Sequence, residues 1–223
     1  MIIKFWAELL GTAFLVLIVL GSGVMGQNLF PGQAGLALLV NSIATGLGLF
    51  VLIQSLGSVS GAHLNPIVSL VELLWGRMEK KELVVFITAQ IAGAYLGVVM
   101  VHLLFNLPVF ITSSIERSGI NLLYSEIVAT FGLIAVIALS GNKHVEFAPI
   151  SIAAYIAAGY WFTSSTAFTN PAVTFARMFT NSFGGMAPAH FFPFVLAQTV
   201  GAVLAWLVLK PLSPHMLVVK VKG

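Results

Sequence analysis

Two short segments decide the fold of this 223-residue chain: Asn65–Ser69, which reads NPIVS, and Asn170–Thr174, which reads NPAVT. They open the apolar stretches Asn65–Trp75 and Asn170–Phe179, each able to span about 15 Å as a helix, half of a hydrocarbon core. Asn followed by Pro is typical of a helix start, and chain rich in Gly, Ser and Thr precedes both segments. We therefore expect two re-entrant loops that return as half-helices, which a membrane protein tolerates only inside protein or along a water-filled cavity.

The composition of the chain indicates that water is not its main solvent. Hydrophobic residues make up 59% of it and charged residues 8%, with a mean hydropathy of +1.03, whereas a soluble domain has about 25% charged residues. This excludes disorder, nucleic-acid binding through basic patches and most cytosolic enzymes. The chain has no Cys and no Asp, so disulfides, thiolate sites and most paired-carboxylate catalysis are excluded, and we expect no metal and no cofactor.

Six windows are apolar enough for membrane spans. They are Phe5–Met25, Leu36–Leu56, Leu83–Phe105, Leu122–Ser140, Phe147–Phe162 (the shortest) and Phe191–Leu209. Lys4 before the first window resembles the start of a signal peptide. Glu8 lies inside that window, however, and the window has a counterpart later in the chain, so we interpret it as a retained span.

The basic residues favour this topology over one in which the short segments cross fully. Arg117 and Arg177 fall on one side of the membrane. Eight fall on the other: Lys4, Arg77, Lys80, Lys81, Lys143, Lys210, Lys220 and Lys222. This positive-inside bias predicts a multi-pass membrane protein with both termini in the cytoplasm. The net charge of +3 then reflects topology and not a nucleic-acid partner.

Three motifs recur in the same order in two halves, about 1–106 and 120–211. Ala7–Thr12 matches Ser125–Thr130, Asn65–Ser69 matches Asn170–Thr174, and Ala89–Ala94 matches Ala197–Ala202. Because each half holds an odd number of spans, the second half must be inserted upside down. The sequence therefore predicts one all-α domain, 1–211, with six transmembrane helices and two re-entrant half-helices in an inverted 3+3 repeat, followed by a C-terminal tail, 212–223.

These features resemble the aquaporin, or major intrinsic protein, family. The resemblance rests on the doubled Asn-Pro motif, the stretch Ser60–Pro66 (SGAHLNP), and Glu8 and Glu126 on the first helix of each repeat. It covers the chain to about Pro211. It implies a homotetramer in a lipid bilayer, with one pore per protomer that passively conducts small neutral solutes.

The expected pore motif comprises Asn65, Pro66, Ile67, Asn170, Pro171 and Ala172. The two Asn side chains cap helix starts that carry partial positive charge. Their amide nitrogens are expected to donate to a permeating oxygen, while the facing dipoles disfavour cations; simple capping is the alternative. The resemblance implies that the two prolines stack at the symmetry axis, and Ile67 adds bulk beside it.

Glu8 and Glu126 lie within apolar helices, where a carboxylate is costly. Their matched positions favour a scaffold role, in which they accept hydrogen bonds from the descending loops; an acid/base pair or proton relay is the alternative. We expect Gln90 and Gln198 to share the scaffold role. The resemblance suggests that His63 lines the cytoplasmic vestibule, and a packing role is the other possibility.

The expected selectivity filter departs from the family pattern. The family's usual filter has an Arg three residues after the second Asn, where this chain has Val173, and the Asp of the common glycerol-channel signature is also missing. Matching the filter by offset, to within one or two residues at the second position, gives Thr45, Ala158, Ala167 and Val173. These uncharged residues predict a wider, less polar mouth. Arg177, four residues further on, either turns toward the vestibule or faces loops and headgroups.

The function expected from this filter is a broad channel for water, glycerol-like polyols and metalloid hydroxides such as arsenite. The choice of arsenite rests on resemblance to a bacterial aquaporin subgroup linked to arsenic efflux, which also has Val in place of the filter Arg. A water-selective channel with an atypical mouth and a coupled transporter or ion channel are the alternatives. An enzyme is not expected, since the sequence shows no nucleophile–base constellation, metal cluster or phosphate loop.

Overall fold

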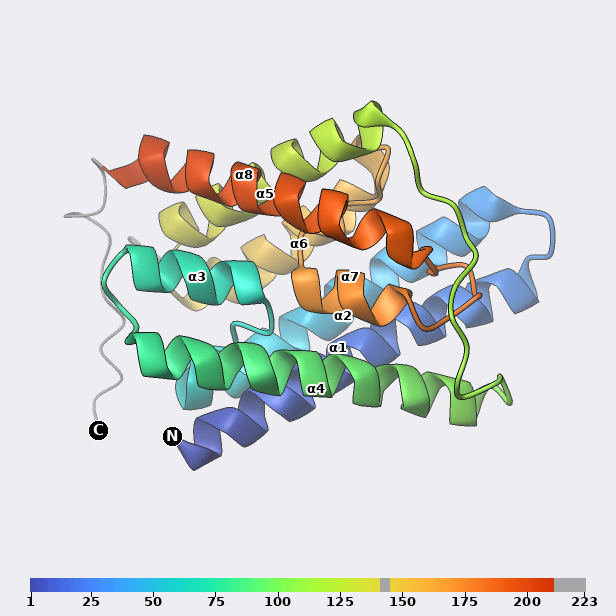
Figure 1. Ribbon diagram of the computed structural model, residues 1–223, viewed down its shortest axis with the longest axis horizontal. Helices are drawn as coiled ribbons and strands as arrows, with labels where there is room; N and C mark the ends of the chain where they lie inside the picture. Colours follow the sequence, from blue (N-terminus) through green and yellow to red (C-terminus); the bar gives the residue numbers. More distant parts are fainter. Residues whose placement is uncertain (141–144, 211–223) are drawn as a thin grey trace.

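The computed structural model describes residues 1–140 and 145–210 (Figure 1). In these ranges the chain forms α-helices and short 3₁₀ turns, and no strand. The elements are α1 (Ile2–Leu29), α2 (Ala34–Ser60), α3 (Pro66–Leu74), α4 (Lys80–Leu104), α5 (Ile120–Ser140), η1 (Val145–Phe147), α6 (Ala148–Phe162), α7 (Pro171–Arg177), η2 (Pro188–His190) and α8 (Phe191–Leu209).

Each of the six apolar windows corresponds to a helix, but α6 is shorter than the other five. Five described segments are long and apolar enough to cross a membrane: α1, α2, α4, α5 and Pro188–Leu209. The sixth, α6, has 15 residues and would rise about 22 Å. It continues from the η1 turn and packs between α2 and α5.

The helices pack in a pattern that is unchanged when the two halves are exchanged. Helix α1 packs on α2 and α4, and its counterpart α5 packs on α6 and α8 (Figure 1). Helices α2 and α6 pack on each other. The half-helix α3 packs on α8, and its counterpart α7 packs on α4. Glycines permit the closest crossings. A Cβ on Gly93 of α4 would collide with the carbonyl oxygen of Leu9 in α1, and one on Gly201 of α8 with that of Ile127 in α5. Small residues at such crossings are typical of membrane helices.

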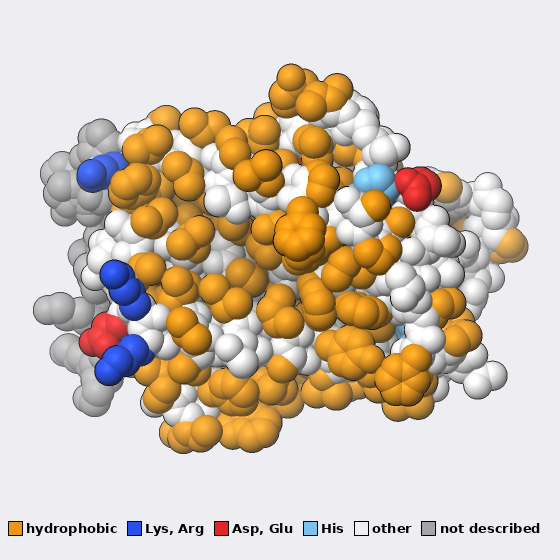
Figure 2. Space-filling view, viewed as in Figure 1, with side chains coloured by type: hydrophobic (Ala, Val, Ile, Leu, Met, Phe, Trp, Pro, Cys, Tyr) orange, Lys and Arg blue, Asp and Glu red, His pale blue; other side chains and the backbone are white. Residues whose placement is uncertain are grey.

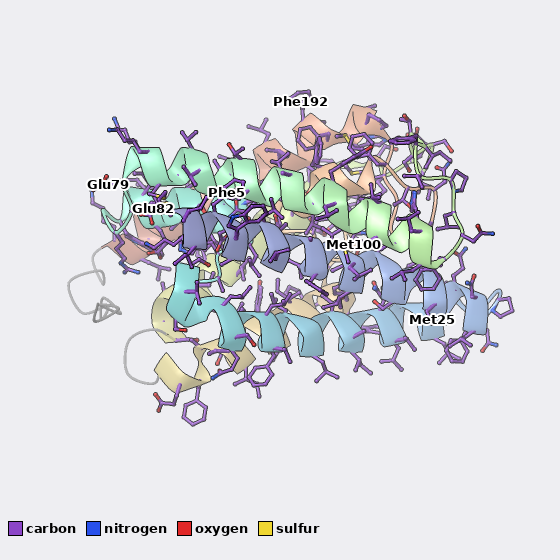
Figure 3. The ribbon with its side chains drawn as sticks, turned by 90° about the horizontal axis from the view of Figure 1, so that it is seen from below. Phe5, Met25, Glu79, Glu82, Met100 and Phe192 are labelled. Atoms are coloured by element: carbon purple, nitrogen blue, oxygen red, sulfur yellow. The ribbon has the colours of Figure 1, made fainter. Side chains whose placement is uncertain are left out.

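Charged and apolar side chains are separated along the long axis of the bundle. Blue and red atoms gather toward the ends in Figure 2, with hydrophobic atoms over the middle. Glu79 and Glu82 lie at the end where α1 begins, and Phe192, 78% exposed, points away from the bundle (Figure 3). Lys4 pairs with Glu82 at 2.6 Å. The expected tail, 212–223, and the basic residue Lys143 lie outside the described residues.

Candidate functional site

A cavity of about 890 Å³ runs through the bundle between the two repeats. Part of its wall is apolar and comes from the long helices: Leu15, Val19, Leu49, Ile53, Leu133, Ile137, Ile152 and Ile156. Another part comes from the last turn of α2 with the loop that follows it, 57–65, and from the second loop, 167–170. The charged residues that line it are Lys4, Glu72, Arg77, Glu82, Glu146 and Arg177.

The two Asn-Pro motifs each begin a half-helix inside the protein. Asn65 is extended and its Oδ1 accepts from the backbone N–H of Ile67 at 2.9 Å. Asn170 does the same for Ala172 at 2.9 Å. Each side chain therefore satisfies a backbone donor that a helix start leaves without a partner.

The amide nitrogens of these two Asn residues reach across to the opposite repeat. Asn65 Nδ2 donates to the carbonyl oxygen of Thr169 at 2.8 Å, and Asn170 Nδ2 donates to that of Leu64 at 2.8 Å. Each amide carries two protons, so one N–H per Asn remains, and both residues line the cavity. The structure thus brings two donors and two positive helix ends together in mid-cavity.

The residues after each Asn point into the core and not into the lumen. Pro66 and Pro171 form the first turns of α3 and α7, which pack against each other. Ile67 is 3% exposed, lies in an apolar cluster with Ile134 and Ala202, and is not among the residues that line the cavity. The extra bulk of Ile67, relative to alanine, is therefore placed away from the permeation path.

Glu8 is fully buried and accepts four hydrogen bonds. Oε1 accepts from Ser60 Oγ at 2.6 Å and from the N–H of His63 at 3.0 Å. Oε2 accepts from the N–H of Leu64 and from Gln90 Nε2, both at 2.7 Å. These bonds connect α1 to the first re-entrant loop and to α4.

Glu126 repeats this arrangement in the second half. Its oxygens accept from the N–H groups of Phe168 and Thr169, both at 2.9 Å, and from Gln198 Nε2 at 2.7 Å. Like Glu8, it is 0% exposed and absent from the cavity wall. The geometry thus shows anchors for the loops and offers neither carboxylate to a solute, which gives the proton-relay alternative no support.

The anchored loops are bent through left-handed backbone at matching positions. The non-glycine residues involved have φ near 48–49°: Ala62 and Leu64 in the first loop, Ala167 and Thr169 in the second. Each such residue costs on the order of 1–2 kcal/mol. Hydrogen bonds to Glu8 and Glu126 hold the backbone in these turns, because their donors include residues 64 and 169 themselves.

His63 lines the cavity on the side of Lys4 and Glu82. Its Nδ1 lies 3.0 Å from Ser69 Oγ, and its ring packs edge-on against Phe86 at 5.1 Å between centroids. The residue therefore does both of the things expected of it: it faces the lumen and it packs.

Three of the four residues expected in the filter line the cavity: Thr45, Ala167 and Val173. Ala158 does not. It is exposed on the outside of α6, and Tyr160, two residues later, lines the cavity and lies 3.1 Å from Thr45 Oγ1.

The misplacement of Ala158 has a simple physical cause. The position was predicted from a fixed residue offset. Residues 163–170, which follow α6, form an irregular loop, and a fixed offset cannot describe the path of such a loop. Helix α6 itself presents Ile152, Ile156 and Tyr160 to the cavity, the i, i+4, i+8 spacing of one helix face. That periodicity was the signal available in the sequence.

Arg177 is inside the protein, 4% exposed, and lines the cavity. It therefore faces neither headgroups nor solvent. The spacing in the sequence indicates this placement. Val173 and Arg177 are about one helical turn apart, so they share a face of α7.

Comparison with known proteins gives consistent matches. A profile described as "Major intrinsic protein" matches residues 1–165. The chain is 47% identical over 213 residues to "Aquaglyceroporin AqpS" of Rhizobium meliloti, covering 93% of this chain and 91% of that protein. It is 30% identical over 229 residues to "Aquaporin Z" of Rhodopseudomonas palustris, covering 95% and 94%.

Two further matches extend the comparison. The "Glycerol uptake facilitator protein" of Bacillus subtilis is 34% identical over 160 residues, covering 64% of this chain and 57% of that protein. Among solved structures, the aquaglyceroporin from Plasmodium falciparum superposes with a TM-score of 0.70 over 96% of this chain and 98% of that one. Its sequence identity is 22%, so this last match speaks for the fold alone.

Proposed function

This chain belongs to the major intrinsic protein family, and we propose that it is a passive channel for water and for small neutral hydroxylated solutes, namely glycerol-like polyols and metalloid hydroxides such as arsenite. The observation that carries the proposal is the cavity itself. Two Asn donors lie in mid-cavity, apolar side chains form much of the wall, and Val173 stands where the family has its filter Arg.

The geometry provides a way for a neutral hydroxyl to cross. The free N–H groups of Asn65 and Asn170 orient a passing oxygen, and the two helix starts place positive potential around it, which opposes cations. The apolar side of the wall makes no competing hydrogen bonds. A solute is therefore held by a few donors and is released again, as conduction requires.

The uncharged residues Thr45, Ala167 and Val173 line the outer lumen. Each is of small or medium volume, and Val173 leaves more room than an Arg at the same position would. Arsenious acid is a neutral trihydroxide similar to glycerol in size and hydrogen bonding. The relatives named as aquaglyceroporin and glycerol facilitator support a polyol-sized pore.

Assembly and orientation are further parts of the proposal. We propose a homotetramer with one pore per protomer, with the end that carries Lys4, Lys80 and Lys210 in the cytoplasm of a bacterium and the chain in its inner membrane. The exposed large hydrophobics, such as Phe192 and Leu196 on α8, supply surface for lipid or for neighbouring protomers.

The test is a permeability panel in proteoliposomes, with light scattering for water and glycerol and direct uptake for arsenite. We expect all three fluxes to exceed those of protein-free vesicles. Leu49→Trp, which adds bulk to the lumen wall, is expected to reduce all of them. Swelling with water but exclusion of glycerol and arsenite would show a water-selective channel, and accumulation against a gradient would show a coupled transporter.

A further inference from the structure

Arg177 is the one described residue that lines two separate cavities. A vestibule of about 320 Å³ is lined by Ala34, Gly35, Leu38, Asn41, Arg117, Thr166, Arg177 and Phe183, and the lumen of about 890 Å³ lies beyond it. Both spaces share Arg177 in their walls. Its side chain is therefore placed to contact a solute that passes from one space to the other.

This guanidinium is held firmly at the junction. Nη1 donates to the carbonyl oxygen of Gly184 at 2.6 Å, and Cζ lies 3.8 Å from the ring centroid of Phe168, a distance typical of a cation–π contact. The Tyr160 hydroxyl lies 3.1 Å from Thr45 Oγ1. Tyr160, Phe168 and Thr45 all line the lumen.

One donor of Arg177 remains unused. Nε is buried and has no hydrogen-bond partner among the described residues, although the side chain is 4% exposed. A buried guanidinium N–H without a partner is costly. An oxygen of a solute or water at the junction would satisfy it.

The surroundings of the junction are positive. Arg117 lies over the same Phe168 ring at 5.2 Å and donates to the carbonyl oxygens of Gly185 and Phe183. Burial, and after it the charge of Arg177, lowers the pKa of Arg117 to about 10, so it is still charged at neutral pH. No Asp or Glu is among the described residues that line the vestibule.

We propose that Arg177, Tyr160, Phe168 and Thr45 form the selective constriction of the channel, one helical turn outward from Val173. The proposal rests on the channel function proposed above. Guanidinium and phenol groups bind the hydroxyls of a neutral solute, the Phe168 ring contacts its carbon side, and the fixed charge repels cations. The charge that is missing at position 173 is thus supplied from position 177, at a level where the lumen opens into the vestibule.

The constriction is tested in proteoliposomes with water, glycerol, erythritol and xylitol, and with K⁺ followed by a potential-sensitive dye. In Arg177→Leu we expect the xylitol-to-water permeability ratio to rise about tenfold, which corresponds to about 1.4 kcal/mol, and a K⁺ leak to appear. Arg117→Leu is the matched control, because it also removes a guanidinium that bonds loop 183–185 and lies over Phe168, but lines the vestibule alone. We expect it to change the ratio and the K⁺ exclusion much less than Arg177→Leu does, because its guanidinium borders the vestibule and not the lumen.

The outcomes are separable. A conducting Arg177→Leu with the wild-type ratio and no K⁺ leak would refute the constriction, and so would an equal change in Arg117→Leu. If Arg177→Leu is not monodisperse, Arg177→Lys decides: it keeps the charge and loses the planar fork, so K⁺ stays excluded while the polyol ratio changes, and an unchanged ratio refutes the proposal. A wild-type chain that conducts nothing above protein-free vesicles refutes the channel function itself.

Discussion

Replacing Glu126 by Ala should release the second re-entrant loop. The carboxylate accepts hydrogen bonds from Phe168 N, Thr169 N and Gln198 Nε2, and the substitution leaves these buried donors without this acceptor. Hydrogen bonds within membrane proteins average about 0.6 kcal/mol, and an orphaned buried donor costs about 1–3 kcal/mol. The expected destabilisation is therefore about 2–5 kcal/mol, before the left-handed backbone of the loop is counted.

The assay is thermal unfolding in detergent, followed by loss of the monodisperse peak. For a chain of this size, 1 kcal/mol shifts Tm by about 2–4 °C, so we expect Tm to fall by roughly 4–20 °C. Water permeability should fall as well, because the loop carries Asn170. Glu8→Ala should behave alike, since Glu8 accepts hydrogen bonds from two backbone N–H groups of the first loop and from Ser60 and Gln90 beside it.

Glu116→Ala is the matched control. Glu116 is exposed and bonds His190 at 2.7 Å on the surface, where an ion pair contributes about 0–1 kcal/mol. A Glu126→Ala protein whose Tm and water permeability equal those of Glu116→Ala would refute the anchoring role.

Two other perturbations follow from the lumen and from the helix crossings. Val173→Arg should narrow the outer lumen, suppress glycerol and arsenite flux and retain some water flux in proteoliposomes; unchanged arsenite uptake would show that position 173 does not border the path. Gly93→Ala should force α4 away from α1, because its Cβ would collide with Leu9 O; overpacking of this kind costs about 1–3 kcal/mol, seen as a lower Tm. Gly35→Ala, whose Cβ meets nothing within 4 Å, should leave Tm unchanged or raise it, and equal losses in both variants would contradict the close crossing.

The parts of the fold that could be predicted are those in which local chemistry repeats. Asn followed by Pro marks a helix start wherever it occurs, and two short apolar segments after such starts cannot span a bilayer, so the half-helices follow from the sequence. A carboxylate in an apolar helix must find donors, and the matched positions of Glu8 and Glu126 indicated the loops that supply them.

The parts that could not be predicted depend on irregular backbone. The positions of Ala158 and Tyr160 relative to the lumen are set by the path of loop 163–170, which no periodicity describes. The left-handed turns at Ala167 and Thr169 are imposed by tertiary hydrogen bonds and oppose the local preference of these residues. Arg177 shares a face with Val173, but the loop that holds it, through Gly184, is formed by residues with no regular pattern.

The crossed Asn bonds have a consequence for biosynthesis. Asn65 finds its backbone acceptor at Thr169, and Asn170 finds its own at Leu64. When a ribosome has released only the first repeat, the Asn65 amide nitrogen lacks this acceptor, which lies about a hundred residues further along the chain. The two halves are therefore alike in plan but are completed together, and a nascent chain arrested between them would hold an unfinished loop in the membrane.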